Sequence, residues 1–99
     1  MKVVVLSNDK NTELFEPFHH CMEKYWPDHP EVIYCMETIE NPYYKTICKN
    51  YPLNQWTKRV RETLEEIDDN QIIIMMDDLF IRTKVDVERI NYLDRKSVV

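Results

Sequence analysis

The stretch Gln71–Ile81, QIIIMMDDLFI, constrains the fold of this chain more than any other. Residues 72–76 form an unbroken apolar run, whereas a strand with one face in water alternates apolar and polar residues. The run therefore predicts a strand buried on both faces, in the centre of a parallel sheet covered by helices. It ends in two acids, Asp77 and Asp78. Because open α/β sheets bind ligands at the carboxyl ends of their strands, we expect the functional site here.

Two further strands are predicted before this one. Lys2–Leu6 is rich in valine, and Glu31–Glu37 is mostly apolar, whereas Tyr43–Tyr51 indicates either a loop or a short edge strand. If the first strand neighbours the run at 72–76, residues 7–9 and the acidic pair face one crevice.

Between and after the predicted strands, apolar residues recur at helical intervals. Pro17 suits the first turn of a helix, and Asn54 predicts the N-cap of a second helix that runs to about Asp68. Asp86 is expected to cap a last helix. The expected core-facing residues are Phe18, Cys21, Met22 and Tyr25 in the first helix, Trp56, Val60, Leu64 and Ile67 in the second, and Val87, Ile90 and Leu93 in the last. Alternating strands and helices predict an α/β, Rossmann-like three-layer α/β/α fold with a mostly parallel sheet of three to four strands.

Composition narrows the class of protein. The 99 residues form a single expected domain, 1–99, with 43% hydrophobic and 31% charged residues. The net charge of −5 disfavours nucleic-acid binding, which needs a basic surface. No apolar stretch approaches the roughly 20 residues of a membrane span, and residues 1–6 suit a strand better than a signal peptide. We therefore expect a cytoplasmic protein.

The absence of glycine excludes several nucleotide and catalytic motifs. A Walker P-loop, a GxGxxG turn and a GxSxG elbow all require glycine. A phosphate would have to be held by side chains, a metal or a helix N-terminus. Cys21, Cys35 and Cys48 lack metal or redox spacing and are expected to be buried, reduced thiols.

The acidic pair is the main candidate site. Hard carboxylate oxygens suit Mg²⁺ or Mn²⁺. Because neighbouring strand residues point to opposite faces, one of Asp77 and Asp78 would bind directly while the other orients it. The alternative is that both acids only end the strand and solvate the turn.

A second unusual feature is the distribution of charge along the predicted second helix. Its basic residues are at the start and its acidic residues at the end, which opposes the helix dipole. Either the basic end binds an anion, or the charges pair with each other on a solvated face. The residues are Lys58, Arg59 and Arg61 against Glu62, Glu65, Glu66, Asp68 and Asp69.

Histidines and tyrosines are weaker candidates. His19 and His20 are adjacent on a helix and point about 100° apart, so they are expected at the surface rather than on a shared ion. Tyr43, Tyr44 and Tyr51 could stack on a base, although packing under a loop is the better-supported interpretation.

Four stretches together resemble a known family. They are VVVLSND, EPFHHCMEKYWPD, LNQWTKRVRETLEEIDDNQIIIMMDDLFI and VDVERI, which span roughly residues 2–92. They resemble the N-terminal part of bacterial and viral glycosyltransferase-like proteins of the type-A fold, often encoded near capsule or surface-polysaccharide genes. The resemblance implies half of that fold, binding a nucleotide-diphospho-sugar. Family members continue well beyond the acidic motif, so we expect a chain truncated relative to the family.

The resemblance also implies roles for individual residues. Asp77 and Asp78 match the acidic motif that holds Mg²⁺ or Mn²⁺, although the usual motif is Asp-x-Asp and here Leu79 follows. Ser7 and Asn8 match positions that hold the nucleoside. Glu37 matches a contact to base or ribose, and Arg59 a basic contact to the nucleotide.

Three hypotheses follow for the function. The first is a metal-dependent glycosyltransferase-like domain that transfers a sugar to a polysaccharide or another acceptor, with the catalytic residues unassigned. The second is a non-catalytic remnant or interaction module that self-associates as a homodimer through a sheet edge, or binds a partner chain that completes the fold. A receiver-type phosphoacceptor ranks last, because only Asp9 follows the first strand and the acidic pair follows a later one.

Overall fold

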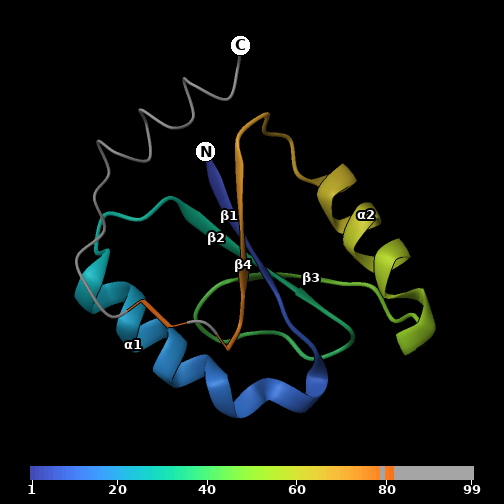
Figure 1. The fold of residues 1–99 in the computed structure, drawn as a ribbon, viewed down its shortest axis with the longest axis horizontal. Helices are drawn as coiled ribbons and strands as arrows, with labels where there is room; N and C mark the ends of the chain where they lie inside the picture. Colours follow the sequence, from blue (N-terminus) through green and yellow to red (C-terminus); the bar gives the residue numbers. More distant parts are fainter. Residues whose placement is uncertain (79, 82–99) are drawn as a thin grey trace.

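A computed structural model of the chain describes residues 1–78 and 80–81. Four strands form one all-parallel sheet in the order β3-β2-β1-β4 (Figure 1). This is a small α/β, Rossmann-like arrangement, as the sequence predicts. The strands are β1 (Lys2–Leu6), β2 (Glu31–Met36), β3 (Lys45–Cys48) and β4 (Ile72–Met76).

The register of the sheet places the ends of β1, β2 and β4 at one level. Leu6 of β1 pairs with Cys35 of β2 on one side and with Met76 of β4 on the other. β1 is central, and its residues 3–5 are completely buried because helices cover both of its faces. The next residues of all three strands therefore emerge along the same carboxyl edge.

Two α-helices lie on opposite faces of the sheet (Figure 1). α1 (Phe15–Tyr25) follows a 3₁₀ segment, η1 (Asp9–Leu14), and α2 (Trp56–Glu66) follows a 3₁₀ turn, η2 (Leu53–Gln55). The core on the α1 side consists of Val3, Val5, Phe15, Phe18, Met22, Trp26, Val32, Tyr34 and Met36. The core on the α2 side consists of Val4, Leu6, Ile33, Cys35 and Ile67, with Val60 and Leu64 partly buried against it.

The prediction for α1 is largely confirmed. Pro17 lies in its first turn, and Phe18 and Met22 are buried, although Cys21 and Tyr25 are only half-buried. After β1, the polar residues Ser7 and Asn8 lead directly into the 3₁₀ segment η1. Its N-cap is Asn8, whose Oδ1 accepts a hydrogen bond of 2.9 Å from Lys10 N.

The prediction for α2 is wrong in two respects. The N-cap residue is Gln55 rather than Asn54, which lies within η2. The side chain of Gln55 makes no capping hydrogen bond. The buried helical residues are Arg59 and Thr63, while Trp56, expected inward, is 42% exposed. Thr63 Oγ1 lies 3.3 Å from Cys35 Sγ of β2 and donates to Arg59 O at 2.8 Å, which satisfies the buried hydroxyl.

The expectation that residues 72–76 form the centre of the sheet is also wrong. Among the described residues β4 pairs with β1 alone and forms an edge. Ile73 and Met75 pack on the α1 side, but Ile74 and Met76 are 53% and 42% exposed on the other side. An unbroken apolar run thus has only one covered face here.

Other expectations have mixed outcomes. The short edge strand within Tyr43–Tyr51 is confirmed as β3. All three cysteines are free, but Cys35 alone is buried, Cys21 is half-buried and Cys48 is exposed. The helix expected from Asp86 lies outside the described residues. Within residues 1–78 and 80–81, no helix has the length and apolar character needed to cross a membrane.

The described backbone contains no residue with positive φ and no cis peptide bond. Both helices end without a left-handed residue: Trp26 after α1 has φ −144° and Ile67 after α2 has φ −90°. The chain therefore makes all its described turns in conformations open to residues with a Cβ atom.

Candidate functional site

The carboxyl edge of β1 and β4 brings Ser7 and Asp77 together. Because Leu6 pairs with Met76, the next residues lie side by side, and Ser7 Oγ donates a hydrogen bond of 2.7 Å to Asp77 Oδ2. Asn11 Nδ2 of η1 donates to the same oxygen at 2.9 Å. Ser7 and Asp77 are each only 4% exposed. The predicted proximity of the residues that follow β1 and β4 is therefore confirmed for Ser7 and Asp77, and Asn11 joins them.

No positively charged group among the described residues pairs with the carboxylate of Asp77. Both of its side-chain donors are neutral, and no ion pair within the described residues includes it. Both hydrogen bonds go to Oδ2, so Oδ1 can face a ligand. A buried carboxylate without a cation is costly unless other groups stabilise it, so the position favours a bound positive charge.

Asp78 lies differently from its neighbour. It is exposed at the turn that follows β4, whereas Asp77 is buried. Both acids lie in the turn after β4, so the alternation expected for strand residues does not apply to them. The two carboxylates thus differ in solvation, and Asp78 can reach a ligand from the solvent side.

A second polar cluster lies between the ends of β1 and β2. Both carboxylate oxygens of Asp9 accept hydrogen bonds: Oδ1 from Thr38 N and Ile39 N at 3.1 Å each, and Oδ2 from Thr38 Oγ1. Desolvation opposes the charged form, but these hydrogen bonds from Thr38 and Ile39 outweigh it and lower the pKa of Asp9 below its ordinary 3.8. Asp9 therefore ties the start of η1 to the loop after β2.

Glu37 and Arg59 meet beside this cluster. Asp9 N donates to Glu37 Oε1 at 3.4 Å, and Arg59 Nη1 lies 3.6 Å from the same oxygen. Arg59 is 5% exposed and its buried Nε has no hydrogen-bond partner. The two residues line a small hollow with Tyr51, Pro52 and Trp56. This hollow therefore offers one carboxylate and one guanidinium with an unused donor.

Two of the tyrosines singled out in the sequence, Tyr43 and Tyr44, pack against α1, whereas Tyr51 lies beside Lys58 of α2. His19 stacks on Tyr43 with ring centroids 4.2 Å apart, and its Nδ1 lies 3.0 Å from Tyr44 Oη. Tyr44 stacks in turn on buried Tyr34. His20 is exposed, as expected for a surface histidine. Tyr43 and Tyr44 thus support the interpretation of packing under a loop.

The structure sorts the candidate residues into two groups. Ser7 and Asp77 share one hydrogen bond, and Glu37 and Arg59 share one ion pair. Asn8 takes part in neither, because its side chain caps η1. Asn11 and Thr38 were missed. Both lie in irregular segments, where local sequence patterns give no signal, although Thr38 donates to Asp9 through both its backbone N and its Oγ1.

Metal-binding capacity at this edge is limited to few acidic ligands. Among the described residues, no group of three or more His, Cys, Asp and Glu side chains surrounds one point. Asp77 and Asp78 fit an ion that needs one or two carboxylates and takes its other ligands from water and phosphate, as Mg²⁺ does. They do not fit a metal that needs a full cage of protein ligands.

Comparison of the chain with protein-family models, curated proteins and solved structures finds no match.

Proposed function

We propose that this chain is a glycosyltransferase-like domain that binds a nucleotide-diphospho-sugar, with Mg²⁺ or Mn²⁺, at the carboxyl edge of its sheet. The observation that carries the proposal is Asp77, a buried carboxylate fixed by Ser7 and Asn11 that lacks a cationic partner among the described residues. The resemblance of the stretches quoted above supports it, and the Rossmann-like topology is compatible with it.

The charges of this edge support a metal-dependent mode of binding. Asp9, Glu37, Asp77 and Asp78 gather at the ends of β1, β2 and β4, where they would repel a bare diphosphate. In the proposed complex Asp77 and Asp78 hold the ion. When bound, it would neutralise the diphosphate and stabilise it as the leaving group.

The chain's own groups have separate tasks in this proposal. Ser7 and Asn11 keep the Asp77 carboxylate in place through its Oδ2. Glu37 accepts a hydrogen bond from a hydroxyl of the ribose or from an amino group of the base. Arg59, whose Nε has no partner among the described residues, donates a hydrogen bond to the nucleotide. The acceptor hydroxyl would attack the anomeric carbon, and the group that takes its proton is unassigned.

Calorimetric titration of the protein with UDP, GDP and CDP, each with and without Mn²⁺, tests the proposal. We expect one nucleotide to bind in a metal-dependent way. Asp78→Ala should abolish this binding without changing thermal unfolding, because Asp78 is exposed. Asp28→Ala is the matched control, since Asp28 is an exposed acid before β2, at the opposite end of the sheet.

Two results would contradict the proposal. One is a folded protein that binds none of the three nucleotides. The other is metal-dependent binding that Asp78→Ala leaves unchanged, which would place the ion elsewhere. Arg59→Met distinguishes the contributions of the two ends of the ligand. It should weaken binding of the nucleotide and leave binding of Mn²⁺ with pyrophosphate unchanged.

A further inference from the structure

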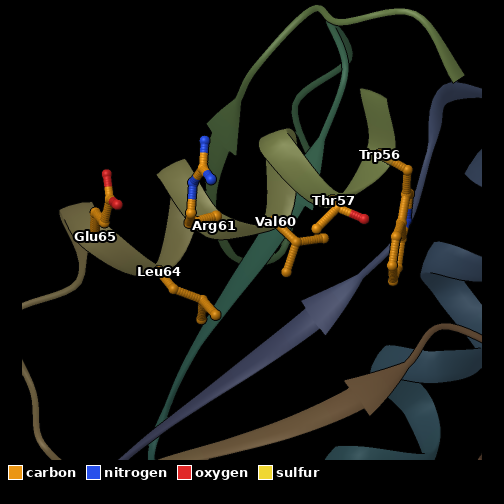
Figure 2. A pocket seen from close by; sticks show the side chains of 6 residues that line it. All are labelled: Trp56, Thr57, Val60, Arg61, Leu64 and Glu65. Atoms are coloured by element: carbon orange, nitrogen blue, oxygen red, sulfur yellow. The ribbon is translucent and has the colours of Figure 1, made fainter. Parts of the chain in front are cut away.

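An apolar groove runs along α2, next to the sheet. Trp56, Val60 and Leu64 follow one another at intervals of four residues and point toward the strands below the helix (Figure 2). The groove has a volume of about 480 Å³, and its other lining residues are Thr57, Arg61 and Glu65. Apolar side chains thus occupy its floor and a charged pair borders it.

β4 extends this apolar surface. Ile74 pairs with Val4 and Met76 with Leu6, and both β1 residues belong to the core on the α2 side. Ile72, Ile74 and Met76 therefore project to that side, where Ile74 and Met76 are 53% and 42% exposed. We call Trp56, Val60, Leu64, Ile72, Ile74 and Met76 the α2–β4 face. Apolar surface of this kind commonly marks a site of protein association.

After β4, the described part of the chain continues on the α1 side of the sheet. Phe80 and Ile81 pack against the core on the α1 side, with Ile73 and Met75. The residues that directly follow the strand therefore do not cover the α2–β4 face. This favours an occupant from outside the described chain.

The charges of α2 indicate which occupant fits. Outside the core, the first half of the helix carries Lys58 and Arg61 and the second half carries Glu62, Glu65 and Glu66, whereas Arg59 is buried beside Glu37. This order opposes the dipole of the isolated helix. It is complementary to a second α2 that runs antiparallel, because each basic half then lies beside an acidic half. A two-fold axis level with residue 63 would place Arg61 of each copy beside Glu65 of the other.

We propose that the chain forms a two-fold symmetric homodimer through the α2–β4 face, with the two α2 helices antiparallel. Such an interface uses the same surface on both copies. Trp56, Val60, Leu64 and the exposed residues of β4 form its apolar centre, and the Arg61–Glu65 pairs form its rim. The packing joins sheet faces rather than pairing sheet edges. It does not depend on nucleotide binding.

Sedimentation velocity over a range of protein concentrations tests the dimer without any nucleotide. We expect the mass to rise from that of the monomer to that of the dimer as the protein concentration increases. Arg61→Glu places like charges together twice in each dimer and should weaken association by about tenfold or more. The double variant R61E/E65R restores both pairs, and its dissociation constant should return to within about threefold of the original. Lys24→Glu is the control, because it makes the same charge change at an exposed position of α1, on the opposite face of the sheet.

Ile74→Lys tests the apolar centre independently of the rim. Because Ile74 is more than half exposed, the variant should keep its thermal unfolding temperature in the monomer and lose the dimer. A wild-type protein that stays monomeric at every concentration would overturn the proposal and show that the chain itself covers the face. A dimer that R61E leaves intact, or that R61E/E65R does not restore, would overturn the antiparallel geometry. So would an open series of higher masses, which a two-fold interface cannot form.

Discussion

Ser7 Oγ donates a hydrogen bond to Asp77 Oδ2 across 70 positions of sequence, and both residues are buried. The bond joins the ends of two neighbouring strands, β1 and β4. Asn11 donates a hydrogen bond to the same oxygen and so connects η1 to both strands. A single oxygen of Asp77 thus fixes three segments. Under the proposed function the other oxygen would bind the metal ion, and the position would then link stability of the edge with binding.

Ser7→Ala tests the structural part of this link. It removes one of two donors from a buried carboxylate, so the free energy of unfolding should fall by about 1–3 kcal/mol. Urea denaturation followed by circular dichroism measures the change. Asn8→Ala is a useful comparison, because it loses a helix cap at the same edge without touching Asp77. An equal loss in both variants would contradict a special role for the Ser7–Asp77 bond.

The buried phenol of Tyr34 should be a source of instability. Its hydroxyl has no hydrogen-bond partner although the residue is completely buried. Tyr34→Phe removes this unpaired group and should raise the free energy of unfolding by about 1 kcal/mol. Tyr44→Phe provides the opposite case, because the Tyr44 hydroxyl interacts with His19 Nδ1 at 3.0 Å. That variant should lose about 1 kcal/mol. Equal signs for the two variants would refute the argument.

Alkaline pH should destabilise the fold through the same tyrosines. Burial first, and then the charge of Glu23, raises the pKa of Tyr44 from 10.0 to about 12. Burial also raises the pKa of Tyr34. The folded state therefore keeps protons that the unfolded state releases, and this contribution is complete below pH 10 and lost as the pH rises to 12. Urea midpoints across this interval should fall less steeply in Tyr44→Phe than in the wild type.

Acid should act on Asp9 in the opposite sense. The hydrogen bonds from Thr38 and Ile39 outweigh desolvation and lower its pKa in the folded state, so its contribution is present above 3.8 and lost as the pH falls through the lower folded value. Asp9→Asn removes this dependence. Its stability should be lower than that of the wild type at neutral pH, and the difference should narrow in acid. A gap that stays constant with pH would show that the Asp9 charge contributes nothing.

Sequence reasoning predicted the strands and the edge that carries the candidate site. It only assumed that Lys2–Leu6 neighbours the run at 72–76; the structure shows that these strands pair in parallel, which brings residues 7 and 77 together. Pairing with Asn11 was not accessible, because η1 has no apolar periodicity that would announce a helix. Local patterns identify regular elements better than the irregular segments that complete a site.

The position of α2 shows where such reasoning stops. The predicted buried face is the apolar stripe at Trp56, Val60, Leu64 and Ile67. Ile67 is buried and Val60 and Leu64 are partly buried, but Trp56 is exposed, and Arg59 and Thr63 are buried instead. Both polar residues are partly satisfied there, Arg59 by Glu37 and Thr63 by the carbonyl of Arg59. Which stripe a helix buries depends on its lateral position over the sheet, and the sequence of the helix alone does not contain that position. For the same reason, the run at 72–76 could not reveal that one of its faces is uncovered.

The absence of glycine from the sequence, together with the absence of left-handed residues from its described part, has a consequence for the unfolded chain. Every residue carries a side chain that restricts its dihedral angles, so the unfolded ensemble has fewer conformations to lose on folding than a chain of average composition. Replacement of any described non-proline residue by alanine leaves the native dihedral angles accessible. Alanine scanning of this protein therefore reports side-chain interactions without the backbone penalty that glycine positions usually introduce.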